Sequence, residues 1–264
     1  QAVLDVLPGK SKKKAKKALA KARTRTHMQV LDKLTDLVDD QQRIVEERPL
    51  IVRETATRAG TPIAEALGLW LQGYLASLSL ERQLLLSRYQ IVDAARKVVG
   101  VGSVGMRCWV VLLQGRDSDD PLFLQIKEAR PSVLEPYAKR HNLENQGQRV
   151  VTGQRLIQGA PDIFLGWGEL EGIQYYVRQL RDMKGGAEFT AGDWRKFDLE
   201  NYSKLCGWAL ALAHAKSGDA AMMAGYMGKS EELDEALARF GHAYAEQNQS
   251  DYELLQQAAA EGRI

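Results

Sequence analysis

The sequence is poor in the residues that build metal sites and disulfides. Its 264 residues include two cysteines and four histidines, and no Cys/His cluster has the spacing of a metal site. Cys108 and Cys206 lie far apart in apolar contexts, which favours buried free thiols in a reducing compartment over a disulfide. These counts argue against a disulfide-stapled scaffold and against a zinc module.

Long apolar runs are also absent. The most apolar stretch, residues 63–80, is interrupted by Glu65, Gln72 and Gly73, so we do not expect it to span a membrane. No signal-peptide pattern is present. We therefore expect a cytoplasmic protein that does not use a membrane as a partner.

The familiar catalytic signatures are missing as well. The sequence has no His-x-Asp loop with a downstream Asn and no Asp-Phe-Gly metal motif. It also has no Gly-x-Ser-x-Gly elbow, no zincin helix and no Walker A loop. The residues by themselves therefore assign no catalytic side chain and no metal ligand.

Charge is distributed unevenly along the chain. The formal net charge is +2, yet residues 1–25 hold nine Lys or Arg and one Asp, so the rest of the chain is acidic. Residues 10–25 combine helix-forming side chains with almost no apolar face. This pattern is typical of a solvated helix or arm, and the alternative is a contact with an acidic partner.

One glycine motif carries the strongest signal. Gly100, Gly102 and Gly105 form a G-x-G-x-x-G sequence, which is followed by a run rich in Val, Leu and Trp. Such a run predicts a strand, whereas a Rossmann oxidoreductase requires a helix after the glycines. Strand, glycine loop and strand is the arrangement that covers ATP phosphates in protein kinases, with Ser103 at the tip of the loop.

A lysine follows in the place that this arrangement requires. Residues 122–127 predict a strand ending in Lys127, whose face also carries Phe123 and Gln125. We expect Lys127 to hold the α- and β-phosphates. The alternative is an edge-strand lysine that extends its ammonium group to water.

The remaining candidate residues complete a nucleotide site. Glu135 is the expected carboxylate partner of Lys127, because Glu128 would point to the opposite face. Arg181 and Asp182 follow the last predicted strand and would lie in the hinge that contacts adenine. A salt-bridge network that includes Arg178 is the alternative explanation of the charges there.

The periodicity predicts three regions in an α+β protein. They are a basic arm and helical segment (residues 1–90), an antiparallel sheet with one helix (91–186), and a helical segment (187–264). The strands are expected at residues 94–99, 107–114, 122–127, 163–167 and 175–180. The helices are expected near residue 28 and at 62–75, 80–89, 146–158, 202–216 (buried), 230–247 and 251–260.

Several long blocks resemble a bacterial family, domain of unknown function 2252. The resemblance covers residues 93–262 and is carried by residues 95–105, 120–129, 147–151, 153–156, 164–167, 177–184, 206–211 and 213–219. The family looks like a distant, circularly permuted relative of kinases. The resemblance implies that this chain corresponds to a C-terminal portion, with catalytic and magnesium-binding loops outside it.

These observations lead to two functional hypotheses. The first is an ATP-binding, phosphotransferase-like protein that uses Mg-ATP and a phosphate acceptor that the sequence does not specify. The second is a non-catalytic, pseudokinase-like scaffold that binds an acidic partner through residues 10–25.

Overall fold

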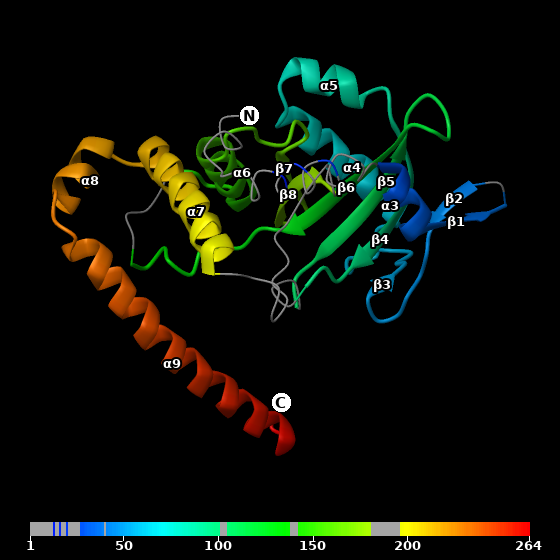
Figure 1. Cartoon of the computed structure of the whole chain (residues 1–264). Helices are drawn as coiled ribbons and strands as arrows, with labels where there is room; N and C mark the ends of the chain where they lie inside the picture. Colours follow the sequence, from blue (N-terminus) through cyan, green and yellow to red (C-terminus); the bar gives the residue numbers. More distant parts are fainter. Residues whose placement is uncertain are drawn as a thin grey trace. The chain divides into compact units, whose positions relative to one another are not determined.

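A computed structural model describes residues 27–39, 41–100, 105–137, 142–180 and 196–264, together with Lys13, Lys16 and Ala20. The chain divides into two compact units, Gln1–Leu210 and Ala211–Ile264. Each unit is described by itself below (Figure 1).

A six-stranded antiparallel sheet is the centre of the first unit. Its strand order is β3-β4-β5-β6-β8-β7. The α+β class with an antiparallel sheet is thus confirmed. The strands are β3 (Ile51–Val52), β4 (Gln90–Lys97), β5 (Cys108–Gln114), β6 (Pro121–Glu128), β7 (Gly166–Leu170) and β8 (Ile173–Gln179).

The connections between these strands are local. Strands β4, β5 and β6 form a meander, in which each strand pairs with the next. Helix α6 (Gln146–Ile157) then leads to the β7–β8 hairpin, and β8 returns to pair with β6. Strand β6 is therefore internal, with a hydrogen-bonded neighbour on each side.

The two faces of the sheet bury different clusters. The α4 face is covered by α4 (Ile63–Ala76) and carries Leu124 and Ile126. The Lys127 face carries Phe123, which packs with Val30 and Leu31 of α3 (His27–Leu34). The predicted alternation of residues 123–127 between the two faces is confirmed. The small sheet of β1 (Thr35–Val38) and β2 (Gln41–Ile44) follows α3, and α5 (Leu80–Leu86) follows α4.

Helix α4 approaches the sheet closely because β7 contains glycines. Trp70 and Tyr74, one helical turn apart, stack with ring centroids 5.1 Å apart, and the Tyr74 hydroxyl donates to the Phe164 carbonyl oxygen at 2.6 Å. A Cβ on Gly166 would lie 2.5 Å from Ser77 Oγ and 2.7 Å from the Tyr74 ring. Only glycine leaves room for this contact, so α4 packs directly on β7.

Most predicted elements are present, with shifted ends. Strand β7 begins at Gly166 and not at residue 163, and the helix expected near residue 28 ends at Leu34, because residues 35–38 pair with β2. The two helices expected at 230–247 and 251–260 are one helix, α9 (Glu232–Ala260). Polar residues between them do not break a helix as proline would.

The burial expected for residues 202–216 is wrong. They lie in α7 (Lys196–Ser217), where Trp208 is 51 % exposed, and Cys206 is exposed while Cys108 is buried as predicted. The following helices, α8 (Ala220–Met227) and α9, contain no buried residue. Their apolar side chains are the kind that normally pack against a partner surface. None of the helices in the described ranges combines the length and apolar character that a membrane crossing demands.

Candidate functional site

The glycine loop joins β4 to β5. Gly100 and Gly105 have φ angles of 148° and 76°, a region that side-chain-bearing residues rarely enter. A Cβ at either position would meet no heavy atom within 4 Å, so glycine is needed there for its backbone conformation and not for lack of space. The other predicted loop residues, Gly102 and Ser103, lie outside the described residues.

Lys127 lies near the end of β6, beside the base of this loop. Its cross-strand neighbours are Cys108 on β5 and Tyr176 on β8. The edge-strand explanation for this lysine is therefore wrong, because β6 is internal. Hydrogen-bonded ladders on both sides fix the backbone from which the ammonium group extends.

A second cation lies close to Lys127. Arg178 on β8 donates from Nε to Gln125 Oε1 at 3.0 Å, and Gln125 shares the face of Lys127. Burial, and secondarily the charge of Arg178, lowers the pKa of Lys127 below its usual value. Among the described residues, neither cation has a carboxylate partner. The other members of the salt-bridge network expected for Arg178, Arg181 and Asp182, lie outside the described residues, so that network stays a prediction. Within the described residues, the arrangement places two positive charges together without a counter-charge.

Glu135 does not supply the missing carboxylate. Its Oε1 accepts from the Ser132 backbone N–H at 3.1 Å and lies 3.9 Å from Arg149 Nε. Arg149 is on α6, which contains no Asp or Glu. The expected pairing of Glu135 with Lys127 is therefore wrong. The hinge residues Arg181 and Asp182 lie outside the described residues.

Helix α6 is nevertheless held firmly on the sheet. Asn145 caps it by accepting from the Gln148 N–H at 3.0 Å. At its other end, the guanidinium group of Arg155 lies 5.9 Å from the ring centroid of Trp167. Trp167 pairs with Tyr176, which in turn pairs with Lys127. Alternation along paired strands therefore places α6 on the same face as Lys127.

Glu128 fixes the end of the glycine loop from the opposite face, as its position after Lys127 predicts. Its buried carboxylate accepts from the Arg107 N–H at 3.0 Å and from Arg130 Nε at 2.6 Å. Arg130 also donates to the Gly105 carbonyl oxygen at 3.1 Å. Burial by itself would raise the pKa of Glu128, but the hydrogen bonds from Arg130 and Arg107 outweigh it and lower that pKa. The loop base is thus held by a carboxylate that stays ionised.

The hydrogen bonds of Glu128 with Arg107 and Arg130, called the Glu128 clamp below, predict a pH dependence of stability. Because the pKa of Glu128 is lower in the folded state, its contribution is complete above the pKa of the unfolded chain and is lost as pH falls through the folded value. We expect Glu128→Gln to cost about 1–2 kcal/mol at pH 7. Urea unfolding between pH 7 and 3 should show the difference from wild type shrinking towards the acid end. A difference independent of pH would contradict the clamp.

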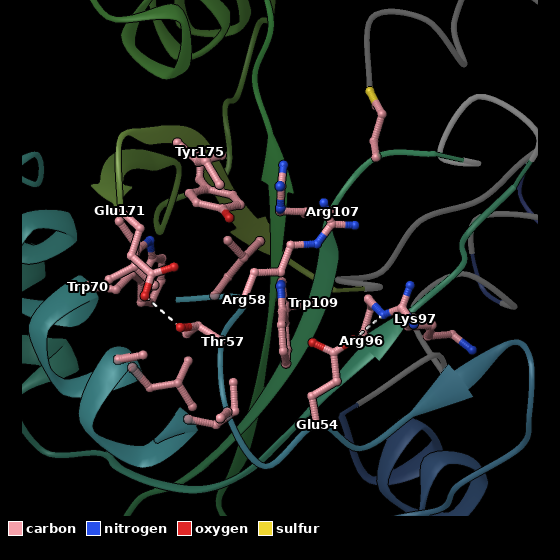
Figure 2. Close-up of a pocket in the computed structure, with 18 of the residues that line it drawn as sticks. Glu54, Thr57, Arg58, Trp70, Arg96, Lys97, Arg107, Trp109, Glu171 and Tyr175 are labelled. Carbon is pink, nitrogen blue, oxygen red and sulfur yellow. Dashed lines mark hydrogen bonds and ion pairs between the residues drawn. The ribbon is translucent and has the colours of Figure 1, made fainter. Parts of the chain in front are cut away.

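A pocket that the sequence did not predict lies on the α4 face of the sheet. Its volume is about 550 Å³. Figure 2 shows Trp109 and Tyr175 from the sheet, Trp70 from α4, and Arg58 from the segment before α4. Gly105 and Arg107 also line it, whereas Lys127 does not. The one available signal is the alternation of Arg107, which immediately precedes β5, with Trp109 on β5, since the other walls are distant in sequence.

In the described ranges, no group of three or more His, Cys, Asp or Glu side chains has an arrangement that could hold a metal ion. The family of this chain can be established by comparison with known proteins. Comparisons with curated proteins and with solved structures gave no match. A family model described as "uncharacterized protein conserved in bacteria (DUF2252)" matches residues 4–258. The match begins well upstream of residue 93, where the resemblance in the sequence blocks starts. The chain therefore belongs to this bacterial family over nearly its whole length.

Proposed function

We propose that this chain carries a protein-kinase-like nucleotide-binding lobe of a phosphotransferase-like protein. The observation that supports it best is the pair of cations on one face of the sheet beside the glycine loop, Lys127 and Arg178, which have no carboxylate partner within the ranges that the structure describes. Phosphate oxygens are the acceptors that such a pair prefers, because each oxygen brings negative charge as well as lone pairs. A neutral ligand would leave the repulsion between the two cations in place.

The order of elements supports the same function. A strand, a glycine loop, a second strand, a lysine-bearing strand and then a helix is the sequence of parts that protein kinases use around ATP phosphates. Here these parts are β4, residues 98–107, β5, β6 and α6. In the proposed complex, the loop backbone and Lys127 orient the phosphates, and the connector that begins at Arg181 and Asp182 lies beside adenine.

The residues present fit a phosphate chain better than they fit its metal ion. Lys127 and Arg178 are donors for phosphate oxygens, and Gln125 holds the Arg178 guanidinium in place. Magnesium, when bound with ATP, would neutralise charge on the phosphates. The family resemblance implies that its ligands and the base for the phosphate acceptor come from loops outside this chain. We therefore expect this chain to bind Mg-ATP weakly and to transfer phosphate little.

Binding of Mg-ATP to the native chain should raise its unfolding temperature with ligand concentration, since a ligand that prefers the folded state stabilises it by mass action. Lys127→Ala should weaken binding about tenfold or more, as expected for the loss of a charge-assisted contact. Lys33→Ala, an exposed lysine on α3, is the matched control and should behave as wild type. Calorimetric melts over a series of Mg-ATP concentrations give the measurement. A shift of the same size in Lys127→Ala would contradict the site, and no shift in a folded sample would contradict nucleotide binding by this chain.

One observation favours the scaffold as the second candidate. The helix facing Lys127 offers no carboxylate, and Glu135 contacts Ser132 and Arg149 instead. Kinases that transfer phosphate require an ion pair between this lysine and a helical glutamate. A scaffold would bind an acidic polypeptide such as poly-glutamate through residues 10–25. Deletion of residues 1–25 should then abolish that binding, while Mg-ATP should have no effect on it.

A further inference from the structure

The pocket on the α4 face has the dimensions and walls of a small-molecule site. Its volume of about 550 Å³ lies within the roughly 300–1,000 Å³ that is usual for ligand pockets. Three aromatic side chains form its walls: Trp70 from α4, Trp109 from β5 and Tyr175 from β8 (Figure 2). Flat, polarisable surfaces of this kind favour a planar ring over a branched aliphatic group.

Two polar groups in these walls have no hydrogen-bond partner among the described residues, and one of them is buried. Trp70 is 2 % exposed, and its Nε1 is buried without an acceptor. Tyr175 is 5 % exposed, and among the described residues its hydroxyl has no hydrogen-bond partner. Buried donors without acceptors are rare in folded proteins, because each one costs the free energy of a lost hydrogen bond. The Trp70 Nε1 lies against β7, where a Cβ on Gly168 would be 3.2 Å away, so the Tyr175 hydroxyl is the donor in these walls that an acceptor atom of a ligand would meet (Figure 2).

The charge around the pocket is positive. Five basic residues line it against two acidic ones, Glu54 and Glu171. Glu54 pairs with Arg96 at 2.6 Å, and Glu171 accepts from the Thr57 hydroxyl at 2.5 Å. Arg58 is exposed at the pocket and has no ion-pair partner among the described residues. A guanidinium group beside aromatic walls is the arrangement that recognises a carboxylate or a phosphate.

This pocket is separate from the Lys127 site. Lys127 and Arg178 share a face with Gln125, whereas Trp109 and Tyr175 share the opposite face with Ile126, a pocket residue. The full thickness of the sheet lies between them. The base of the glycine loop reaches the pocket through Gly105 and Arg107.

We propose that the α4-face pocket binds a small planar aromatic anion, with its ring between Trp109, Trp70 and Tyr175 and its acidic group on Arg58. The inference goes beyond the proposed nucleotide site and does not require it. Arg107 lies in the pocket wall and also contacts Glu128, which holds the base of the glycine loop. A ligand in the pocket would therefore contact a residue that positions that loop.

The probe for this site is 2-naphthoate, titrated into the whole chain by calorimetry. We expect 2-naphthoate to bind saturably. Binding should be at least about tenfold weaker for cyclohexanecarboxylate, whose ring is not planar or aromatic, and for 2-naphthamide, which lacks the charge. Arg58→Ala and Trp109→Leu should each weaken 2-naphthoate about tenfold. Arg58 lies in an exposed segment, so its removal leaves the core intact, and thermal melts verify folding of Trp109→Leu.

Two controls separate this site from the others. Arg82→Ala removes a surface arginine on α5 that does not line the pocket, and Lys127→Ala removes the proposed phosphate ligand; both should bind 2-naphthoate like wild type. Absence of saturable binding, or binding that neither pocket variant weakens, would overturn the proposal. Displacement of 2-naphthoate by Mg-ATP would also overturn it, because the pocket would then be a nucleotide site. Loss of ATP binding in Lys127→Ala with intact 2-naphthoate binding supports two separate sites.

Discussion

Replacing Gly147 by alanine is expected to destabilise the folded chain by about 3 kcal/mol, near the upper end for an overpacked position. Gly147 lies in the first turn of α6 and is buried against β8. An added Cβ would lie 2.2 Å from the Tyr175 carbonyl oxygen and 3.0 Å from Asn145 Oδ1. The first of these atoms belongs to a paired strand and cannot rotate away, so the helix must lift from the sheet.

The same helix provides a matched control. Gly153 lies two turns further along α6, and a Cβ there would meet nothing within 4 Å. Gly153→Ala should stabilise the chain by about 0.5–1 kcal/mol, because alanine loses less conformational freedom in a helix than glycine does. Urea unfolding of the two variants measures both changes in the free energy of unfolding, which we expect to have opposite signs. Equal stability of Gly147→Ala and wild type would show that α6 does not dock on β8 as described.

Replacing Asp93 by alanine should cost about 3 kcal/mol, the lower end for breaking a buried ion pair. The Asp93 carboxylate, 11 % exposed, accepts from the Ile44 N–H at 2.7 Å, pairs with Arg53 Nη2 at 2.5 Å and lies 3.7 Å from Arg43 Nη1. Arg53 Nε is already buried without a partner. Without the carboxylate, the Arg53 guanidinium would remain partly buried with no counter-charge.

A double variant distinguishes this explanation from a simple packing loss. In Asp93→Ala/Arg53→Ala the uncompensated guanidinium is gone, so the cost should be clearly less than the sum of the two single variants. Asp93→Asn keeps an acceptor for the Ile44 N–H and should lie between wild type and Asp93→Ala. Denaturant midpoints at pH 7 are sufficient for the comparison. Strict additivity of the two alanine variants would contradict a coupled pair.

The sequence predicted those parts of the fold that depend on neighbouring residues. The alternation of residues 122–127 located β6 and its two faces, and the acidic turn before Pro121 located the β5–β6 hairpin. Contacts between distant residues could not be predicted this way. Asp93 pairs with Arg53, forty positions away, and no local pattern specifies such a partner. The apolar composition of α7 shows only that its side chains favour burial, and Trp208 is half exposed.

In the candidate site too, the sequence predicted what depends on neighbouring residues and not what depends on contacts between distant ones. The place of Lys127 follows from strand periodicity, and its nearness to the glycine loop follows from a meander with short turns. Which groups surround Arg178 is a property of the folded sheet, where Gln125 accepts from its Nε and none of the described carboxylates lies beside it. Glu135 is the next acid along the sequence after Glu128, but in the fold it lies beside Arg149 and not beside Lys127. The α4-face pocket joins several separate segments, which is why sequence reasoning missed it.

The position of the glycine loop has a consequence for how the chain folds. The loop closes the β4–β5 hairpin, and β5 is the strand on which β6 then pairs. Local hairpins form sooner than distant pairings because closing a short loop loses less entropy. Glycine raises the entropic cost of that closure, since it has more conformations to give up. The loop proposed to enclose a ligand therefore also lowers the stability of the hairpin that it closes, and a glycine-to-alanine substitution at a loop position that accepts a side chain should raise the free energy of unfolding even where it weakens binding.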